Sequence, residues 1–357
     1  MSQTLSRPKV QPWSQSSVAS VRPLILASVL PAVFAALVGL LANLDFSVAL
    51  LVIFVPLQAL AAGFVGFKTY GKRGLKDAVL IFVTIFFSMM VMVLLTSVLV
   101  SVAIAGFSAM SPQFLSQNNV YVSPTTSLEY GGVGHAILGT LLIVILTTIA
   151  AVPLGIAMAV FLTQSNAKHK GIVRTVTQAL SGLPSVVSGL FILAIMGFVG
   201  IERSGLTGAL ALFPLMLPTV ARVAEESLRL VPSDLRLAAL ALGAPNYKAF
   251  FQVILPAAKS GIITALLLGL ARIIGETAPL ILTINANNST NLNPFAEGIA
   301  TLPTYIYGFL SSGYSTSQAR AWGAALVLLL LVALLFGAAR IMTRQKSLKT
   351  KSTKKAK

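Results

Sequence analysis

Long apolar stretches separated by short polar segments alternate along the whole chain of 357 residues. A helix needs ~20 apolar residues to cross the hydrocarbon core of a bilayer. In lipid the backbone must satisfy its own hydrogen bonds, which favours helices. The pattern therefore predicts eight spans, over residues 24–41, 46–67, 79–105, 137–162, 176–199, 206–221, 262–284 and 322–342.

Prolines inside these stretches are expected to kink the helices rather than end them, because neighbouring helices can satisfy the freed backbone groups. The stretch over 206–221 is short for a span and contains two prolines, Pro214 and Pro218. The prolines expected to mark kinks are Pro31, Pro56, Pro153 and Pro184.

Composition agrees with this pattern. Apolar residues make up 56% of the chain and charged residues 10%, and the mean hydropathy is +0.88, whereas a soluble domain has ~25% charged residues. The predicted fold class is an all-α integral membrane protein, a polytopic helical bundle. The sequence has no cysteine and only two well-separated histidines, His135 and His169, so neither a disulfide nor a metal site is expected.

Basic residues lie on alternate sides of the predicted spans. Of the 26 Lys and Arg, nearly all lie in the N-terminal tail, in segments 68–76, 168–174 and 222–259, and in the C-terminal tail. Such an excess marks the cytoplasmic side, so both termini are predicted to be cytoplasmic. The C-terminal run KSLKTKSTKKAK is expected to be an anchor attracted to membrane lipid. Binding of nucleic acid is the alternative for this run, and we do not predict it.

The segments on the opposite side are long. Residues 106–134 contain no Lys or Arg and are rich in Ser, Asn, Gln and Pro. Residues 285–320 have an apolar middle that is too short and too interrupted by Pro and Gly to span. We expect that middle part to form a short helix at the outer surface.

The polar segment over 222–259 predicts two short helices joined by a bend. Ser233 is expected to be the N-cap of the first helix, with Asp234 at the positive end of its dipole. Gly243 fits a position of positive φ after the helix, and a second helix is predicted over 246–255, ending before Pro256. Tyr247, Phe250 and Phe251 are then available as anchors for a partner's groove. The alternative is an ordinary loop on the membrane surface.

The same segment resembles a motif of ABC importer permeases, E-A-A-x3-G-x9-I-x-L-P, which docks the ATPase. Ala238, Ala239 and Gly243 match, as do Leu255 and Pro256. The sequence departs from the motif at the glutamate position, which is Leu237, and has Val253 in place of isoleucine. The resemblance implies that the ATPase docks on Ala238, Ala239, Gly243, Tyr247, Phe250, Leu255 and Pro256.

A second pattern narrows the family. The runs ARIIGETAPLILT (271–283) and LNPFAEGIATLPTYIYGF (292–309) are similar to those of the PstA family, one of the two permeases of bacterial phosphate importers. The resemblance implies a type I ABC importer transmembrane fold in the inner membrane, carrying phosphate. It implies four partners: a second permease (PstC-like), a dimeric ATPase (PstB-like), an extracytoplasmic phosphate-binding protein and lipid. ATP and Mg would be used by the partner ATPase, and no cofactor by this chain.

The domain organisation follows from this resemblance. Residues 1–67 are predicted to be a tail and an accessory membrane hairpin outside the usual six-helix core. Residues 68–134 would hold the first core span and an outer loop. Residues 135–342 would form the importer domain with its docking loop over 222–259, and residues 343–357 a basic cytoplasmic tail.

Two groups of charges stand within or beside predicted spans. An Arg or Lys at the bilayer centre costs roughly 2.5–3.5 kcal/mol, and Arg272 and Glu276 are four residues apart, so we expect them to pair on one helical face. With Thr277 they are candidates for the substrate pathway, the alternative being a structural ion pair. Arg222, Glu225 and Glu226 are candidates for a gate, the alternative being an interfacial boundary.

Other function classes fit less well. The sequence Gly66-x4-Gly71-Lys72 resembles a phosphate-binding loop, but Arg73 replaces the required Ser or Thr and no nucleotide domain surrounds it. No catalytic residues are predicted, and the chain is not expected to be an enzyme. The open alternatives are an importer of another oxyanion such as sulfate or molybdate, and a secondary transporter, which predicts inverted repeats.

Overall fold

The computed structural model describes residues 18–42, 45, 48–165 and 167–343. The N-terminal residues Arg7 and Lys9 and the basic tail over 344–357 lie outside the described residues. Helices make up every regular element of the described part. They are α1 (Val18–Leu41), η2 (Ala49–Phe54), α3 (Val55–Phe107), α4 (Pro112–Ser116), α5 (Gly134–Gln164), α6 (Lys170–Ser181), α7 (Ser185–Val199), α8 (Gly205–Arg229), α9 (Ser233–Ala241), α10 (Asn246–Ala249), η3 (Phe250–Ile254), α11 (Leu255–Ala257), α12 (Lys259–Ile274), α13 (Ala278–Thr283), α14 (Leu302–Leu310) and α15 (Ser315–Thr343).

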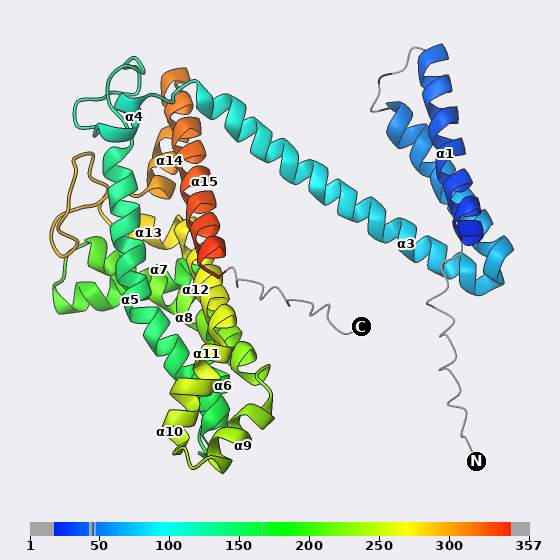
Figure 1. Cartoon of the computed structure of the whole chain (residues 1–357). Coiled ribbons are helices and arrows are strands. Elements are labelled where there is room, and N and C mark those ends of the chain that lie inside the picture. Colours follow the sequence, from blue (N-terminus) through cyan, green and yellow to red (C-terminus); the bar gives the residue numbers. More distant parts are fainter. Residues whose placement is uncertain (1–17, 43–44, 46–47, 166, 344–357) are drawn as a thin grey trace, which may run out of the picture. The chain divides into compact units, whose positions relative to one another are not determined.

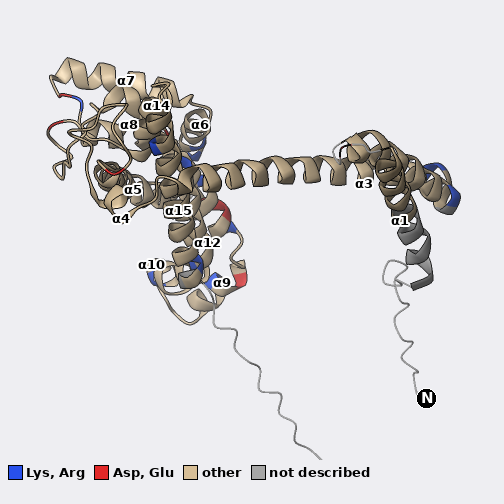
Figure 2. Cartoon of the chain, turned by 90° about the horizontal axis from the view of Figure 1, so that it is seen from above, with Lys and Arg blue, Asp and Glu red and all other residues tan. Residues whose placement is uncertain are grey.

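The chain divides into two compact units, Met1–Leu99 and Val100–Lys357. In the first unit, α1 packs against the π-helical segment η2, where a Cβ on Gly39 would lie 3.1 Å from Ala49 Cβ. The predicted spans 46–67 and 79–105 are joined within α3 by a sharp bend at Gly71 (φ 64°, ψ −146°) and not by a polar loop. Figure 2 shows basic residues at this bend.

The second unit is built around α8, which packs against α5, α6, α7, α12 and α13 (Figure 1). The short span predicted over 206–221 is in fact a 25-residue helix. Its prolines do not break it, and hydroxyl groups of neighbouring helices donate hydrogen bonds to two of its carbonyls before Pro214. Ser188 Oγ donates to Ala211 O at 2.6 Å, and Thr147 Oγ1 donates to Ala209 O at 3.2 Å.

Glycines let two helices approach α8 closely. A Cβ on Gly155 of α5 would lie 2.9 Å from Val220 of α8, and a Cβ on Gly269 of α12 would lie 2.7 Å from the same valine. Leu212, Met216 and Val220 are almost completely buried in the core that results. Interhelical contact of small residues is how membrane helices pack without a hydrophobic driving force.

Two predicted spans are broken, which corrects the expectation of continuous helices. The span over 176–199 consists of α6 and α7, bent by 105° at Gly182 to Pro184. Pro184 disfavours a helical conformation of Leu183, and its own ψ is 135°. The span over 262–284 is interrupted at Gly275, and α13 starts after it with Pro279 in its first turn. The two interrupted spans meet, since a Cβ on Gly189 would lie 2.7 Å from Pro279 Cα.

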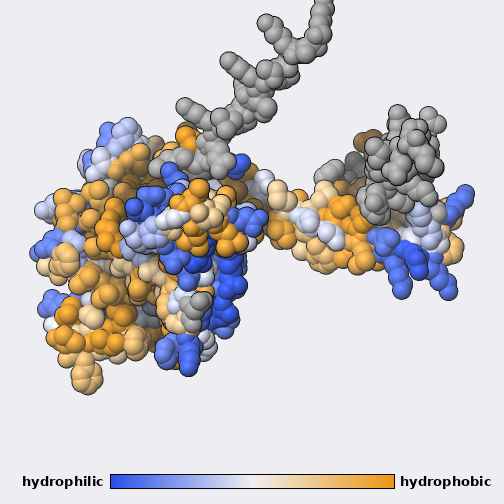
Figure 3. All heavy atoms as spheres, turned by 60° about the horizontal axis from the view of Figure 1, so that its bottom comes forward, coloured by the Kyte–Doolittle hydropathy of each residue, from blue (hydrophilic) through white to orange (hydrophobic). Residues whose placement is uncertain are grey.

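Among the described residues, five helices are long and apolar enough to cross a membrane, or up to seven if each bent pair is one span. Val29–Leu41 is a shorter apolar helix. Figure 3 looks toward the end of the bundle that carries α9 and α10, and shows hydrophilic atoms there between apolar flanks. The predicted orientation of the termini and the domain boundaries remain predictions.

The segment 111–134, which we call the cap segment, is fastened to the start of α15. Arg320 is fully buried. Its Nη1 donates to Thr126 O at 3.0 Å, and its Nη2 donates to Ser127 O at 2.7 Å and to Tyr130 O at 2.9 Å. Ser317 Oγ adds a hydrogen bond to Pro124 O. Backbone carbonyls thus satisfy the two terminal nitrogens of a buried cation, while its Nε has no partner among the described residues.

The expected short outer helix is present as α14. Thr301 caps it by accepting from the Thr304 amide, and Pro303 stands in its first turn. Tyr305 of α14 is buried beside His135, with ring centroids 5.8 Å apart. Burial raises the pKa of the Tyr305 hydroxyl, and the nearby charge of Arg320 acts in the opposite direction. The hydroxyl is therefore neutral at physiological pH.

Arg320→Met should loosen the cap segment, because the carbonyls of Thr126, Ser127 and Tyr130 lose their donor at a cost of about 3 kcal/mol. We expect faster amide hydrogen exchange over residues 119–133 and a lower thermal midpoint. Arg203→Met, at an exposed arginine, is the matched control and should change neither. Unchanged exchange in the Arg320 variant would contradict the assigned anchoring role.

Candidate functional site

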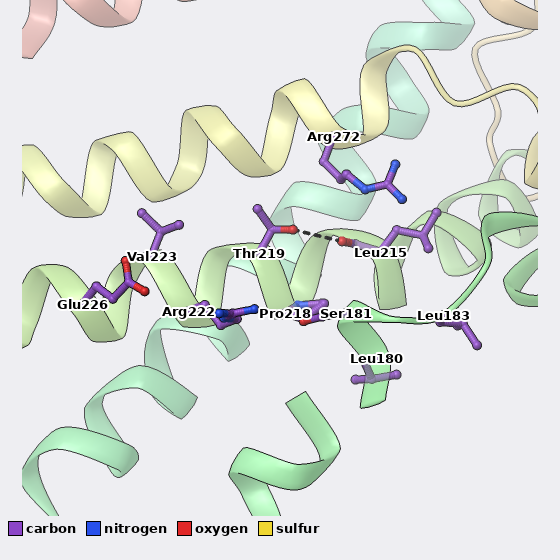
Figure 4. A pocket seen from close by; sticks show the side chains of 10 residues that line it. All are labelled: Leu180, Ser181, Leu183, Leu215, Pro218, Thr219, Arg222, Val223, Glu226 and Arg272. Atoms are coloured by element: carbon purple, nitrogen blue, oxygen red, sulfur yellow. Dashed lines mark hydrogen bonds between the residues drawn. The ribbon is translucent and has the colours of Figure 1, made fainter. Parts of the chain in front are cut away.

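A hollow of about 330 Å³ lies where α8 faces α12 and the break between α6 and α7. Figure 4 shows Arg222, Val223 and Glu226 coming from α8, and Arg272 coming from α12 above them. The remaining lining is largely apolar or hydroxylic: Leu180, Ser181, Leu183, Leu215, Pro218 and Thr219. Two arginines and one glutamate therefore share a small hollow within the helical bundle.

The expected pair of Arg272 and Glu276 is confirmed, since Arg272 Nη1 contacts Glu276 Oε1. The expectation that both lie on one helical face is wrong. Arg272 is in the last turn of α12, whereas Glu276 follows Gly275 in the break before α13. The side chain of Arg272 is 44% exposed and that of Glu276 14%. The interruption of the helix thus leaves the arginine accessible and its carboxylate partner sheltered.

Thr277, the third residue proposed for the pathway, precedes α13 and is half-buried. It is not among the residues that line the hollow around Arg272. Thr283 is buried and donates its hydroxyl to Pro279 O within its own helix. Of the three predicted pathway residues, Arg272 is the one whose side chain faces the hollow.

A second hollow of about 240 Å³ shares Arg222 and Glu226 with the first. Glu225 lies at its edge and binds two arginines, Arg174 Nη2 at 3.0 Å and Arg229 Nη2 at 2.6 Å. The expected gate residues are therefore close together, but the ion pairs of Glu225 are with Arg174 and Arg229. The sequence analysis missed both arginines. The i,i+4 spacing of Glu225 and Arg229 could have indicated one pair, whereas Arg174 lies on another helix.

The predicted bend at Gly243 is confirmed. Gly243 has a φ of 80°. Its amide donates to Leu240 O at 2.9 Å, and the next amide, of Ala244, donates to Ala239 O at 3.1 Å, which together form a Schellman motif. Ser233 is the first residue of α9 and not its N-cap, because Pro232 holds that position. Asp234 lies in the first turn, as expected.

The second short helix extends further than predicted. It continues from α10 through the π-helical segment η3 into α11 and ends at Ala257, so Pro256 lies inside it. Proline has no amide hydrogen to donate to the fourth residue before it, and the wider π-turn directly before α11 accommodates this loss. The chain then bends by 68° into α12.

The predicted docking residues of these helices fall into two groups. Tyr247 is 62% exposed, and Ala238, Gly243 and Pro256 are exposed as well. Phe250 instead packs against the hydrophobic core of the second unit, and Ala239 and Leu255 are half-buried. Phe251, a predicted anchor, is 61% exposed, and the structure adds exposed Leu237 at 61% and Leu242 at 89%. The exposed apolar surface of these helices therefore includes Leu237, Leu242, Tyr247 and Phe251.

Comparison with known families matches residues 151–347 to the binding-protein-dependent transport system inner membrane component family. This match covers more than half of the chain and includes both hollows and the bent helices. The first unit and the cap segment lie before it.

Several relatives are similar over much of their length. The phosphate transport system permease protein PstA 1 of Mycobacterium tuberculosis (strain CDC 1551 / Oshkosh) is 42% identical over 205 residues, 57% of this chain and 67% of the relative. The permease protein PstA of Yersinia pestis is 36% identical over 253 residues, 70% of this chain and 83% of the relative.

Among solved structures, a chain of a bacterial alginate ABC transporter, crystallised with its alginate-bound periplasmic protein, has a similar fold. Its TM-score is 0.53 at 16% identity, and the match covers 76% of this chain and 98% of that one. At this identity the likeness concerns the fold alone. It agrees with the predicted fold class of an ABC importer permease.

Proposed function

The chain belongs to the family of binding-protein-dependent transport system inner membrane components, and on that premise we propose that it is the permease subunit of an ABC phosphate importer. The observation that carries the proposal is the 36–42% identity to phosphate transport permeases over most of their length. The chain is a multi-pass protein of the inner membrane and not an enzyme.

Arg272 is proposed to lower the barrier for phosphate in the translocation pathway. Phosphate carries one to two negative charges and accepts many hydrogen bonds, so an accessible guanidinium between apolar walls stabilises it electrostatically. Glu276 would neutralise Arg272 when no anion is bound. Glu226 in the hollow and Glu276 beside Arg272 offset the two arginines, which gives a weak and transient site and favours release, since transport fails if the ion is held tightly.

The exposed bend around Gly243 is proposed to dock a dimeric ATPase. ATP and Mg would be bound by that ATPase and not by this chain. Leu242, Tyr247 and Phe251 present apolar side chains of the kind that fill a partner's pocket. The opposite face of the same helices, through Phe250 and Ile254, packs into the core that also contains α8 and α12. Motion of the bend would therefore be transmitted directly to the helices that line the hollow.

Glu225 is proposed to act as a latch on the cytoplasmic side of the pathway. Because it bridges Arg174 of α6 and Arg229 of α8, it restrains the broken span relative to the central helix. Arg222 and Glu226 line both hollows and would be uncovered when α6 moves. A second permease subunit completes the pathway, and an extracytoplasmic binding protein delivers phosphate to it.

Arg272→Ala should abolish uptake of labelled phosphate in cells that depend on this importer, because the anion loses the guanidinium that α12 contributes to the hollow. Arg272→Lys should retain part of the uptake, since it keeps the charge but not the planar donor geometry. Both variants should assemble normally. An excess of unlabelled sulfate should leave wild-type uptake unchanged.

Two results would count against this assignment. Full uptake by the alanine variant would make the Arg272–Glu276 pair structural. Competition by sulfate as strong as that by phosphate would make the chain a permease for oxyanions in general.

Gly243→Asp should prevent copurification of the ATPase while membrane insertion stays normal. The substitution strains a residue with φ of 80° and places a charge in the apolar bend. Gly171→Asp is the matched control, because Gly171 is also exposed with no atom within 4 Å of an added Cβ, but lies on α6 away from the bend. Normal copurification with the Gly243 variant would refute docking at the bend.

A further inference from the structure

The bend of α3 at Gly71 gathers basic side chains between two apolar helical segments. Lys68, Lys72, Arg73 and Lys76 are all exposed, and Asp77 is the one acidic residue of the 68–77 stretch. None of the four cations takes part in the ion pairs recorded among the described residues. This group, which we call the basic bend, lies outside the part of the chain that matches the transporter family.

Three glycines force the four cations together. Gly71 has a φ of 64° and a ψ of −146°, a conformation that residues with a Cβ rarely adopt. A Cβ on Gly74 would lie 2.1 Å from Gly66 O, and a Cβ on Gly66 would lie 2.5 Å from Gly74 O. The backbone therefore folds back on itself within nine residues, and the basic side chains on both arms of the turn share one small surface.

The surroundings of the basic bend are those of a membrane interface. Ala49–Lys68 on one side and Tyr70–Phe107 on the other are both apolar enough to span a bilayer. Two aromatic residues flank the bend, Phe67 at 52% and Tyr70 at 74% exposure, and tyrosine at such a position sits at the level of the lipid headgroups. Arms of this length and composition can cross the hydrocarbon core, which places the cations between them at the headgroup layer.

We propose that the basic bend is a binding site for the phosphate group of anionic phospholipids. A cation near an anionic membrane surface gains ~1 kcal/mol, and guanidinium and ammonium groups from both arms can approach a single headgroup phosphate together. The apolar arms beside the basic bend can contact the acyl chains of a lipid. Inorganic phosphate has no acyl chains, so these arms favour a phospholipid as the ligand. The site is independent of the transport pathway proposed above.

The test is the lipid preference of the full-length chain in phosphatidylcholine vesicles that contain a trace of spin-labelled phosphatidylglycerol or spin-labelled phosphatidylcholine. Around the wild-type chain, spin-labelled phosphatidylglycerol should be more abundant than spin-labelled phosphatidylcholine. The variant K72Q/R73Q should lower that preference roughly fivefold or more. The matched control K168Q/K170Q, which removes the same charge from another polar segment, should lower the preference clearly less than K72Q/R73Q does, since those residues lie outside the clustered turn.

A further variant distinguishes the effect of clustering the four cations from the effect of their total charge. Gly71→Ala keeps every cation but strains the turn, so the preference for the anionic label should fall. If the Gly71 variant does not insert into the membrane, the comparison of K72Q/R73Q with K168Q/K170Q still tests the proposal. Equal preference of wild type, K72Q/R73Q and control would overturn the proposal. Displacement of the labelled lipid by inorganic phosphate, and not by chloride at equal ionic strength, would assign the site to the free ion and would also overturn it.

Discussion

Close packing against α8 determines where the other helices of the second unit lie. The helix is mostly buried, and glycines of α5 and α12 bring their backbones against Val220. A third glycine, Gly261 at the start of α12, lies so close to Ser227 that a Cβ there would be 2.3 Å from its hydroxyl oxygen. Because these contacts leave no room to slide, a displacement of one helix must be followed by its neighbours.

This constraint explains how the chain tolerates interrupted helices inside a membrane. Free backbone groups are costly in lipid, but the break between α6 and α7 borders the hollow beside α8, and α7 packs against α13. The interruptions in turn expose the charges. Glu276 and Arg272 pair across the end of α12, and the bend between α6 and α7 forms one wall of the hollow. The packing against α8 therefore determines both the helical framework and the position of the charged hollow.

Sequence periodicity predicted the long helices, the left-handed glycine at position 243 and the Arg272–Glu276 pair, because each depends on residues close together in the chain. It did not predict the breaks at Gly182–Pro184 and Gly275. A stretch of apolar residues looks the same whether straight or bent, and whether a proline kinks or breaks a helix depends on neighbours that satisfy the backbone. Pro218, buried within α8, and Pro184, at a 105° bend, are opposite outcomes.

Most of the contacts that sequence reasoning missed are long-range, the i,i+4 pair of Glu225 and Arg229 being the exception. Arg320 anchors the carbonyls of Thr126, Ser127 and Tyr130, almost 200 residues away, and Arg174 reaches Glu225 from a separate helix. Likewise, Phe250 and Phe251 are adjacent and equally apolar, and the packing of the helix against the core decides that Phe250 enters it while Phe251 remains exposed. No local pattern distinguishes such residues.

The central claim is that movement of phosphate through this subunit is driven by a separate ATPase. Uptake of labelled phosphate into vesicles reconstituted with the complete importer, compared with vesicles that contain this chain alone, tests it most directly. We predict uptake only when permeases, ATPase, loaded binding protein and ATP are all present. Rapid phosphate flux down its gradient through vesicles that hold this chain alone would contradict the account.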